Sequence, residues 1–320
     1  MLVLITGATG FVGSHLVEYL ERETDWELAG ISRTLRHAGN LQRLSSRLRL
    51  STADLNEPAS IESAIAAVRP DGIIHLAGQP LEPISWLDPA ATFRINVIGL
   101  LNLIQATLKC DLRPRIVLGG SALMYGLVKD EENPINESQL PRPASPYAVS
   151  KLAADYTGYQ YFLSHHLPIV RLRPFNQLGP RQSPDFAVAA FAQQIAEIEA
   201  GKREPILRVG NLAAARDFLD VRDAAAAYRA ALERGEAGEA YNVGSGEAHT
   251  MDFILHKLLE LSSATIGVER DEARFRPVDL PRIVCDAGKF RRATGWQPSI
   301  PLERSLFDTL QYWRQQTSRS

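Results

Sequence analysis

Cysteine is scarce in this chain of 320 residues: only Cys110 and Cys285 occur, far apart and outside any C-x-x-C spacing. Two distant cysteines form no disulfide framework, and they provide no zinc site. The seven histidines show no metal-ligand spacing either. The sequence therefore predicts no bound metal. Its low cysteine content fits a reducing compartment, so we expect a cytoplasmic protein.

An excess of positive charge and a long apolar run are also lacking. Lys and Arg number 35 against 37 Asp and Glu, which gives a net charge of -2. No summed positive field then attracts nucleic acid. No stretch approaches the ~18 apolar residues of a membrane span, and "MLVLITGATG" shows no basic leader. We expect a small-molecule partner, with neither nucleic acid nor a membrane involved.

The chain contains short apolar runs that alternate with helical patterns from its first residues. Leu16 and Leu20, with Val12 and Val17, form a helical stripe between the first two runs. Alternation of this kind favours a parallel sheet covered by helices on both faces. We therefore predict an α/β protein with a doubly wound parallel sheet of the Rossmann type. The expected strands lie within 2–6, 26–31, 48–52, 72–78, 115–120 and 168–174.

The pattern becomes looser after Pro174, where Gly and Pro are more frequent. A helical pattern near 187–200 precedes an apolar run at 204–212. These features predict a smaller, mixed α/β lobe that follows the parallel sheet.

Two domains are expected, although not with a single cut between them. Residues 1–174 should form a dinucleotide-binding domain and 175–320 a substrate-binding domain. An Ala-rich helical pattern at 221–235 and a strand pattern at 239–244 suggest that the chain returns to the first sheet near 213–243.

A glycine-rich turn, "TGATGFVGSHL" (6–16), follows the first expected strand and opens a helix. In dinucleotide-binding folds, glycines at such positions permit a tight turn, backbone contact with a diphosphate, and close packing of helix on sheet. The helix N-terminus adds N–H donors and a partial positive charge. We infer dinucleotide binding rather than a merely tight turn. The residues expected to contact the cofactor here are Gly7, Thr9, Gly10, Phe11, Val12 and Gly13.

The second expected strand runs into "ISRTLRH", which carries Arg33 where NAD-preferring sites usually have an acid. A guanidinium there suits a 2′-phosphate, and Arg36 lies close enough in sequence to assist. Two solvated loop arginines are the alternative. The sequence favours NADP as the cofactor, with NAD as the second choice.

Further cofactor contacts are expected after the third and fourth strands. Asp54 follows the third strand, where its carboxylate could accept from adenine; helix capping is the competing role, and both hold if Asn56 is the cap. The small residues of "HLAG" (75–78) fit a close backbone approach to the cofactor, and His75 itself is expected to be a packed strand residue. The contacts expected from these two segments are Asp54, Leu55, Leu76, Ala77 and Gly78.

The segment "SPYAVSK" (145–151) places Tyr147 and Lys151 one turn apart on a helix that should begin at Ser145 and Pro146. An ammonium near a phenol favours the phenolate, so it should lower the pKa of Tyr147 from its usual ~10. Tyr147 could then give a proton to a carbonyl oxygen that becomes an alkoxide. Most Tyr-x-x-x-Lys pairs are ordinary helix surface, so the context decides.

Ser121 supplies that context. It follows the fifth expected strand in "LGGSALMYG" (118–126), at the carboxyl edge of the sheet where open α/β folds bind ligands. With the glycine turn, Ser121, Tyr147 and Lys151 make the chain resemble the short-chain dehydrogenase/reductase superfamily, in particular its extended branch, which acts on nucleotide sugars. The resemblance implies that these three residues are catalytic and that Lys151 also anchors the nicotinamide ribose.

The resemblance implies substrate contacts in the second half of the chain. "RPFNQLGPRQSPDF" (173–186) is similar to the family's substrate segment, in which Asn176 would meet the sugar-phosphate. "GNLAAARDFLDVRD" (210–223) resembles the subgroup that acts on GDP-mannose derivatives, where two arginines would neutralise the diphosphate. Surface loop arginines are the alternative. The substrate contacts expected on this basis are Ser121, Asn176, Arg216 and Arg276.

Dehydratases and reductases of this subgroup differ just after the fifth strand. Family dehydratases carry a glutamate near the position where this chain has Ala122 and Leu123, because elimination of water needs a base there. Leu123 cannot serve as a base, whereas Ser121 can still hold a carbonyl. The resemblance therefore implies NADPH-dependent reduction of the C4 ketone of a GDP-4-keto-6-deoxyhexose, as from GDP-4-keto-6-deoxy-D-mannose to GDP-D-rhamnose.

Two other functions stay open. A nucleotide-sugar 4-epimerase with tightly bound NAD shares these residues but consumes no net NADPH. A non-catalytic NAD(P)-binding sensor is the other, although the intact Tyr147 and Lys151 count against it. The resemblance also implies a homodimer that pairs through helices near 89–109 and 145–166.

Overall fold

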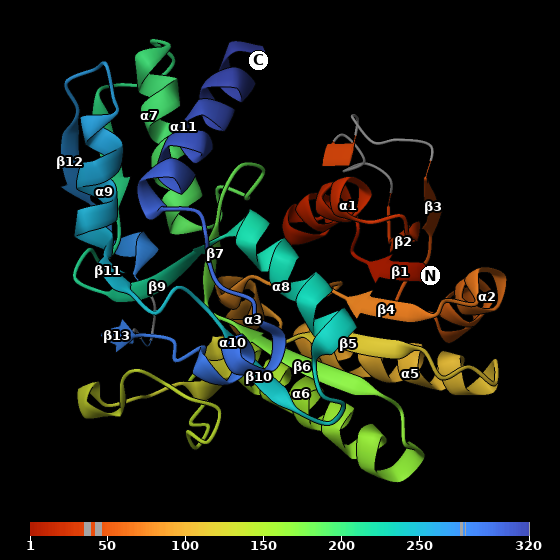
Figure 1. Ribbon diagram of the computed structural model, residues 1–320. Coiled ribbons are helices and arrows are strands. Elements are labelled where there is room, and N and C mark those ends of the chain that lie inside the picture. The colour runs from red at the N-terminus through yellow and green to blue at the C-terminus, as the bar shows by residue number, and fades with distance from the viewer. Residues whose placement is uncertain (35–39, 42–46, 276–277, 279, 320) are drawn as a thin grey trace.

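The computed structural model describes residues 1–34, 40–41, 47–275, 278 and 280–319. Its main element is a sheet of seven strands in the order β10-β6-β5-β4-β1-β2-β3, and every neighbouring pair is parallel (Figure 1). This confirms the predicted fold class. The strands are β1 (Leu2–Thr6), β2 (Glu27–Ser32), β3 (Leu48–Thr52), β4 (Gly72–His75), β5 (Arg115–Gly119), β6 (Ile169–Pro174) and β10 (Ala240–Val243).

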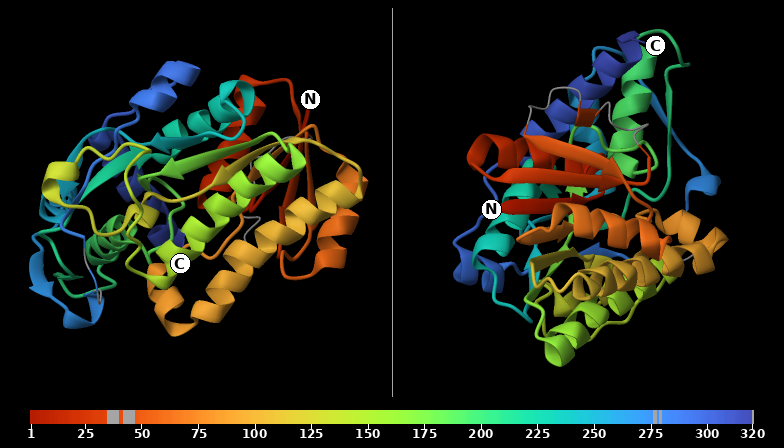
Figure 2. Two further views of the ribbon diagram at one scale, coloured as in Figure 1. Left: turned by 90° about the horizontal axis from the view of Figure 1, so that it is seen from below. Right: turned by 90° about the vertical axis from the view of Figure 1, so that its right-hand side faces the viewer.

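Helices cover both faces of this sheet (Figure 2). Val3 and Ile5 of β1 pack towards α1 and α8, whereas Leu4 between them packs towards α2 and α5. Because side chains alternate along a strand, this one short run supplies core residues to both faces. The helices around the sheet are α1 (Phe11–Glu23), α2 (Pro58–Val68), α3 (Glu82–Leu87), α4 (Pro89–Phe93), α5 (Gly99–Lys109), α6 (Pro146–His165), α8 (Val221–Arg234) and α10 (Gly288–Thr294).

Strand β4 is shorter than its apolar run suggests. It ends at His75, whereas the sequence pattern continues to Gly78. The reason is the side chain of Thr6, whose Oγ1 accepts hydrogen bonds from the backbone N–H groups of Leu76 and Ala77, each at 3.1 Å. These bonds draw the chain out of the sheet and into a turn beside the glycine-rich segment.

The helical stretch Pro89–Lys109 corrects the expectation that no segment approaches a membrane span. It is long and apolar enough to cross a membrane by length and composition, with a mean hydropathy of 1.2. Of the 18-residue segment with this hydropathy, 44% is buried inside the fold. Leu100, Leu103 and Ile104 lie in the core between the sheet and α2. The stretch consists of α4, one π-helical turn (Arg94–Ile98) and α5.

A smaller lobe stands beside the carboxyl edge of the main sheet (Figure 1). Its central strand β9 (Ala215–Asp220) pairs with three very short strands, and β8 pairs with β12 separately. Phe191, Ile195, Leu255 and Leu306 belong to its core. The other elements are β7 (Asn176–Leu178), β8 (Ile206–Val209), β11 (Ala248–Thr250), β12 (Gly267–Arg270), β13 (Arg282–Ile283), α7 (Ala187–Glu199), α9 (Met251–Glu260) and α11 (Leu302–Arg319).

The chain crosses between the two parts more than once. Strand β9 of the lobe leads directly into α8, which packs on the main sheet beside α1. Strand β10 then pairs with β6 at the sheet edge. Three 3₁₀ turns complete the described elements: Ala122–Tyr125, Asp130–Glu132 and Glu272–Arg274. The division of the chain at residues 174 and 175 stays a prediction.

Candidate active site

The cofactor-binding and catalytic residues expected from the sequence lie at the carboxyl edge of the parallel sheet. The glycine-rich turn follows β1, Arg33 follows β2, and Ser121 follows β5. Tyr147 and Lys151 approach this edge from the first turns of α6. Parallel strands place their carboxyl ends together, so the fold brings these separate motifs into one crevice.

The glycine-rich turn fits closely against the end of β4. Gly7 has a φ of +72°, and a Cβ there would lie 2.9 Å from the backbone nitrogen of Ala77. A Cβ on Gly13 would lie 2.1 Å from the carbonyl oxygen of Gly7. A side chain at either position would push the helix and the turn apart.

This cradle fits the diphosphate of a dinucleotide. The N-cap residue of α1 is Gly10, which has no side chain to occupy the helix end. The first turn consists of Phe11, Val12, Gly13 and Ser14, none of which carries a charge. The N–H groups of a first helical turn have no intrahelical acceptor, so they are donors for an anion. The residues present therefore match the expected cofactor.

Small hydroxyls replace the usual acid at the end of β2. Ser32 Oγ lies 2.8 Å from Thr9 Oγ1 and donates to the carbonyl oxygen of Thr34 at 3.0 Å. Arg33 beside it is exposed. The absence of a carboxylate at Ser32 and the nearby cation suit a 2′-phosphate. Arg36 lies outside the described residues.

Asp54 and Leu55 follow β3 as expected. Asp54 is half-buried, and its Oδ1 accepts from the backbone N–H of Asn56 at 2.9 Å. Neither Asp54 nor Asn56 caps the next helix, because α2 begins after Glu57, which makes no side-chain cap. The competing role of Asp54 as a helix cap is therefore wrong. A proline at the first helical position, Pro58, removes one N–H that a cap would otherwise satisfy.

Helix α6 begins where the sequence predicts, with Ser145 Oγ accepting from the N–H of Ala148 at 3.2 Å. Tyr147 is 7% exposed, and its phenol lies near the hydroxyl of Ser121. Burial raises the pKa of Tyr147 to about 12; the Ser121 hydroxyl lowers it and the charge of Glu82 raises it. The prediction of a lowered pKa is wrong for the protein without cofactor, because burial outweighs the other influences.

Lys151 does not act on the phenol directly. Its Nζ donates to the carbonyl oxygen of Gly119 at 2.9 Å, and it lies 3.8 Å from where a Cβ on Gly78 would be. Burial lowers the pKa of Lys151 to about 8. The ammonium therefore lies between the ends of β4 and β5, inside the crevice.

A buried ion network holds α6 against the sheet. Asp155, two turns after Tyr147, accepts from Arg171 at 2.6 Å and from Arg173 at 2.9 and 3.1 Å. Arg173 also donates to Tyr125 Oη at 2.9 Å. All of these residues are at most 8% exposed. The network fixes the helix that carries Tyr147 and Lys151.

Sequence reasoning missed two polar groups that shape the crevice. Thr6 Oγ1 lies 2.8 Å from Nδ1 of His75, whose pKa is lowered to about 3 by burial and by Lys151. His75 is thus a neutral packed residue, as the sequence suggested. Asn96, in the π-helical turn, accepts from the N–H of Gln79 at 2.8 Å and donates to Ser150 Oγ at 3.0 Å. No local motif marks either contact.

Two of the residues expected to contact the substrate, Asn176 and Arg216, lie in the smaller lobe. Asn176 lies on β7, which pairs with β9 in register with Phe218. Arg216 on β9 is 6% exposed, and its Nη1 donates to the carbonyl oxygen of Leu280 at 2.5 Å. Asn176 and Arg216 thus belong to neighbouring strands. Arg276 lies outside the described residues.

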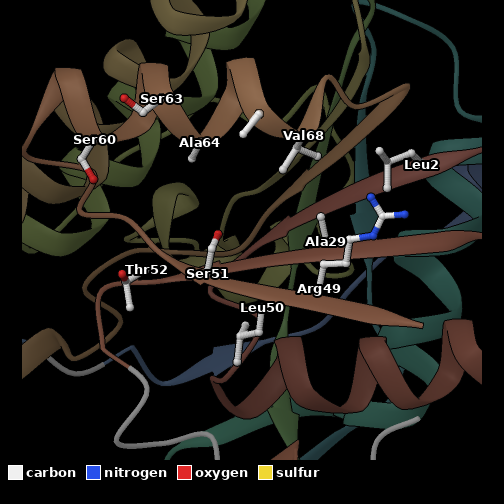
Figure 3. A pocket seen from close by; sticks show the side chains of 11 residues that line it. Leu2, Ala29, Arg49, Leu50, Ser51, Thr52, Ser60, Ser63, Ala64 and Val68 are labelled. Atoms are coloured by element: carbon white, nitrogen blue, oxygen red, sulfur yellow. The ribbon is translucent and has the colours of Figure 1, made fainter. Parts of the chain in front are cut away.

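A separate groove of about 480 Å³ lies between α2 and the β2–β3 edge of the sheet (Figure 3). Ser60 and Ser63 of α2 face Ser51 and Arg49 of β3 across it. None of the site residues predicted above lines it. It is therefore distinct from the crevice at the carboxyl edge.

The chain is similar to known proteins over nearly its whole length. The family model described as GDP-mannose 4,6 dehydratase matches residues 4–309. A GDP-6-deoxy-D-mannose reductase from Pseudomonas aeruginosa is 35% identical over 312 residues, covering 97% of this chain and 96% of that protein. The chain therefore belongs to the family described as GDP-mannose 4,6 dehydratase.

Solved structures agree with the GDP-mannose 4,6 dehydratase family assignment. RMD from Pseudomonas aeruginosa, complexed with NADPH, has a TM-score of 0.87 at 35% identity, covering 98% of this chain and 99% of that one. A UDP-glucose 4-epimerase from Thermus thermophilus, complexed with NAD, has a TM-score of 0.87 at 32% identity, with the same two shares. The prediction of an NAD(P)-dependent enzyme of the extended short-chain dehydrogenase/reductase class is confirmed. The cofactors of these two relatives are consistent with NADP or NAD.

Proposed function

We propose that the protein reduces the C4 ketone of a GDP-4-keto-6-deoxyhexose with NADPH, converting GDP-4-keto-6-deoxy-D-mannose to GDP-D-rhamnose. The segment after β5 carries this proposal. The Ser121 hydroxyl lies near the phenol of Tyr147, whereas Leu123 in the following 3₁₀ turn is half-buried against the core. A hydroxyl pair is thus ready for a carbonyl oxygen, while the position of the dehydratase base is apolar. The 35% identity to a GDP-6-deoxy-D-mannose reductase supports the same substrate class.

Tyr147 is the proton donor in this proposal. With a pKa of about 12 it keeps its proton at neutral pH, as a donor must before reduction begins. Ser121 and Tyr147 would hydrogen-bond the ketone oxygen and stabilise the alkoxide as the phenolic proton moves to it. When bound, NADPH would supply the hydride.

The cofactor would be held by residues already placed at the sheet edge. The glycine-rich turn and the first turn of α1 face the diphosphate, and Arg33 is available for the 2′-phosphate. Lys151, beside Gly78 and Gly119, would hold the nicotinamide ribose.

The test is a stoichiometric assay with freshly prepared GDP-4-keto-6-deoxy-D-mannose and NADPH. We expect one NADPH oxidised per sugar reduced, and GDP-D-rhamnose as the product by NMR. A ketone that stays unreduced while NADPH stays intact would refute the proposal.

A 4-epimerase with tightly bound NAD is the second candidate, because the Thermus thermophilus epimerase complexed with NAD superposes with a TM-score of 0.87. Purified protein distinguishes the two. An epimerase would carry NAD through purification and interconvert nucleotide sugars that differ at a C4 hydroxyl without added cofactor, whereas the reductase needs NADPH in stoichiometric amount and a C4 ketone.

We also propose a homodimer formed through α5 and α6. Four apolar side chains on α6 are more than a third exposed: Val149, Tyr156, Tyr159 and Leu163. Their spacing of seven, three and four residues places them on one face of the helix, as in helix pairs. Sedimentation should show a dimer, and Leu163→Glu should dissociate it; a monomeric wild-type protein would contradict the dimer.

A further inference from the structure

The turn at residues 179–182 joins the substrate side of the molecule to the cofactor side. It leads from β7, which carries Asn176, to α7 of the smaller lobe. In Figure 1 the loop between β7 and α7 extends towards α1, and Arg181 makes the contacts between them.

Arg181 binds three partners on the cofactor side at once. Its guanidinium donates to the Glu18 carboxylate at 2.5 and 3.0 Å, and to Nδ1 of His15 at 3.0 Å. It also donates to the carbonyl oxygen of Asn40 at 2.9 Å. His15 and Glu18 lie on α1, whose N-terminus forms the expected phosphate cradle.

The contact continues to the glycine-rich turn. The side chain of Asn40 donates to the carbonyl oxygen of Thr9 at 3.0 Å. His15 Nε2 lies 2.9 Å from the carbonyl oxygen of Pro180. Because Arg181 can only donate and that carbonyl can only accept, His15 must be the neutral tautomer with its proton on Nε2. Helix α1 is therefore hydrogen-bonded to the turn at residues 179–182 through both Pro180 and Arg181.

The turn needs these outside contacts to keep its shape. Arg181 has a φ of +72°, a conformation that costs a residue with a side chain energy unless its surroundings hold it. Gln182 is 5% exposed, and its Oε1 is buried without a hydrogen-bond partner among the described residues. A turn strained in this way is well placed to respond to changes at α1.

We propose that Arg181 is a positioning residue that transmits occupancy of the cofactor site to the substrate strand β7, an inference that rests on the proposed function. Cofactor binding orders the glycine-rich turn and the first turn of α1. The hydrogen bonds of Asn40, His15 and Glu18 with Arg181 then restrict the motion of the 179–182 turn, and with it the position of Asn176. Substrate and cofactor therefore bind with positive coupling, and by reciprocity each tightens the other by the same factor.

Hydrogen exchange with NADPH alone tests this proposal without any substrate. In the wild-type protein we expect NADPH to slow amide exchange across 176–186 by about 5-fold or more, on the usual scale of coupling between sites. In Arg181→Met the ratio of rates with and without NADPH should fall to about 1. Glu18→Gln should reduce the ratio from the other end of the contact, and Arg181→Lys should restore part of it.

Arg314→Met is the matched control. Arg314 also pairs in bidentate fashion with a carboxylate, Glu199, and donates to a backbone carbonyl, but it lies wholly within the smaller lobe. It should leave the NADPH-dependent ratio unchanged. If Arg181 served only to stabilise the turn, Arg181→Met would speed exchange equally with and without NADPH and preserve the ratio, which would overturn the proposal. Wild-type protein that binds no NADPH would overturn the proposed function as well.

Discussion

The two parts of the molecule hold their site residues by different means. In the parallel-sheet half, Tyr147 and Lys151 lie one turn apart on α6, and the glycine-rich turn is a continuous segment. In the smaller lobe, Arg216 reaches the carbonyl of Leu280, 64 residues away, and Arg314 reaches Glu199, 115 residues away. The residues proposed for the chemistry therefore lie in local motifs, whereas the lobe that carries the proposed substrate contacts is held by contacts between distant segments.

This difference predicts which variants affect turnover and which affect binding. Substitutions at the sheet edge should reduce the rate of reduction or the affinity for the cofactor. Substitutions in the lobe should weaken binding of the nucleotide sugar and spare the cofactor. Variants at the sheet edge and in the lobe test this separation between turnover and binding of the nucleotide sugar.

Tyr147→Phe should lower kcat by about 100- to 10,000-fold, the range for loss of a general acid. The ring keeps its burial and only the proton donor is lost. Affinity for NADPH, measured by calorimetry, should stay unchanged. Tyr161→Phe is the control, because Tyr161 lies on the same helix outside the proposed dimer face, with its ring stacked on His165. Near-normal turnover by Tyr147→Phe would remove Tyr147 from the chemistry.

Asp155→Asn should lower the free energy of unfolding by about 3–5 kcal/mol, since it leaves two buried guanidinium groups without their carboxylate. Arg171 and Arg173 are the groups affected. Urea unfolding measures this loss. Glu62→Gln, which breaks an exposed pair with Lys109, should change stability little. Equal effects of the two substitutions would show that the network does not hold α6.

Arg216→Met should raise KM for the nucleotide sugar by about 10- to 100-fold, because a charge-assisted hydrogen bond contributes about 1.5–3 kcal/mol and about 1.4 kcal/mol is a factor of ten. The KM for NADPH should stay within about 2-fold, within the scatter of individual contributions. Arg282→Met, on the neighbouring strand β13, is the control. A comparable rise in both KM values would contradict the separation of the two sides.

The pH dependence of kcat/KM should show a descending limb near pH 8. Burial lowers the pKa of Lys151 to about 8, so the ammonium is present below that pH and lost above it, while Tyr147 keeps its proton throughout. The rate should fall by about tenfold per pH unit above the limb. Lys151→Arg should move the limb to higher pH. A limb that stays near pH 8 in Lys151→Arg would assign it to another group.

Much of the sheet half could be predicted from the sequence. Buried parallel strands are continuous apolar runs, and Ser145 and Pro146 mark a helix start with recognised chemistry. The three-residue strands β7 and β11 and the two-residue strand β13 could not be found, because they are too short for any periodicity and exist only through pairing with β9.

The electrostatics of the crevice could not be predicted from spacing alone. The sequence places Lys151 near Tyr147, but only the fold shows that Nζ is bound by Gly119 and that burial raises the pKa of Tyr147. Arg181 was also invisible, since its partners Glu18 and His15 lie more than 160 residues away. Burial and long-range contacts are properties of the folded chain rather than of any motif.

Reduction of GDP-4-keto-6-deoxy-D-mannose with NADPH deuterated at the transferred position of the nicotinamide tests the central claim most directly. The account predicts one deuterium at C4 of the sugar for each NADPH oxidised, with rhamnose stereochemistry, and loss of that label transfer in Tyr147→Phe. A ketone that stays unreduced while NADPH stays intact, or a reduced sugar without deuterium at C4, would contradict it.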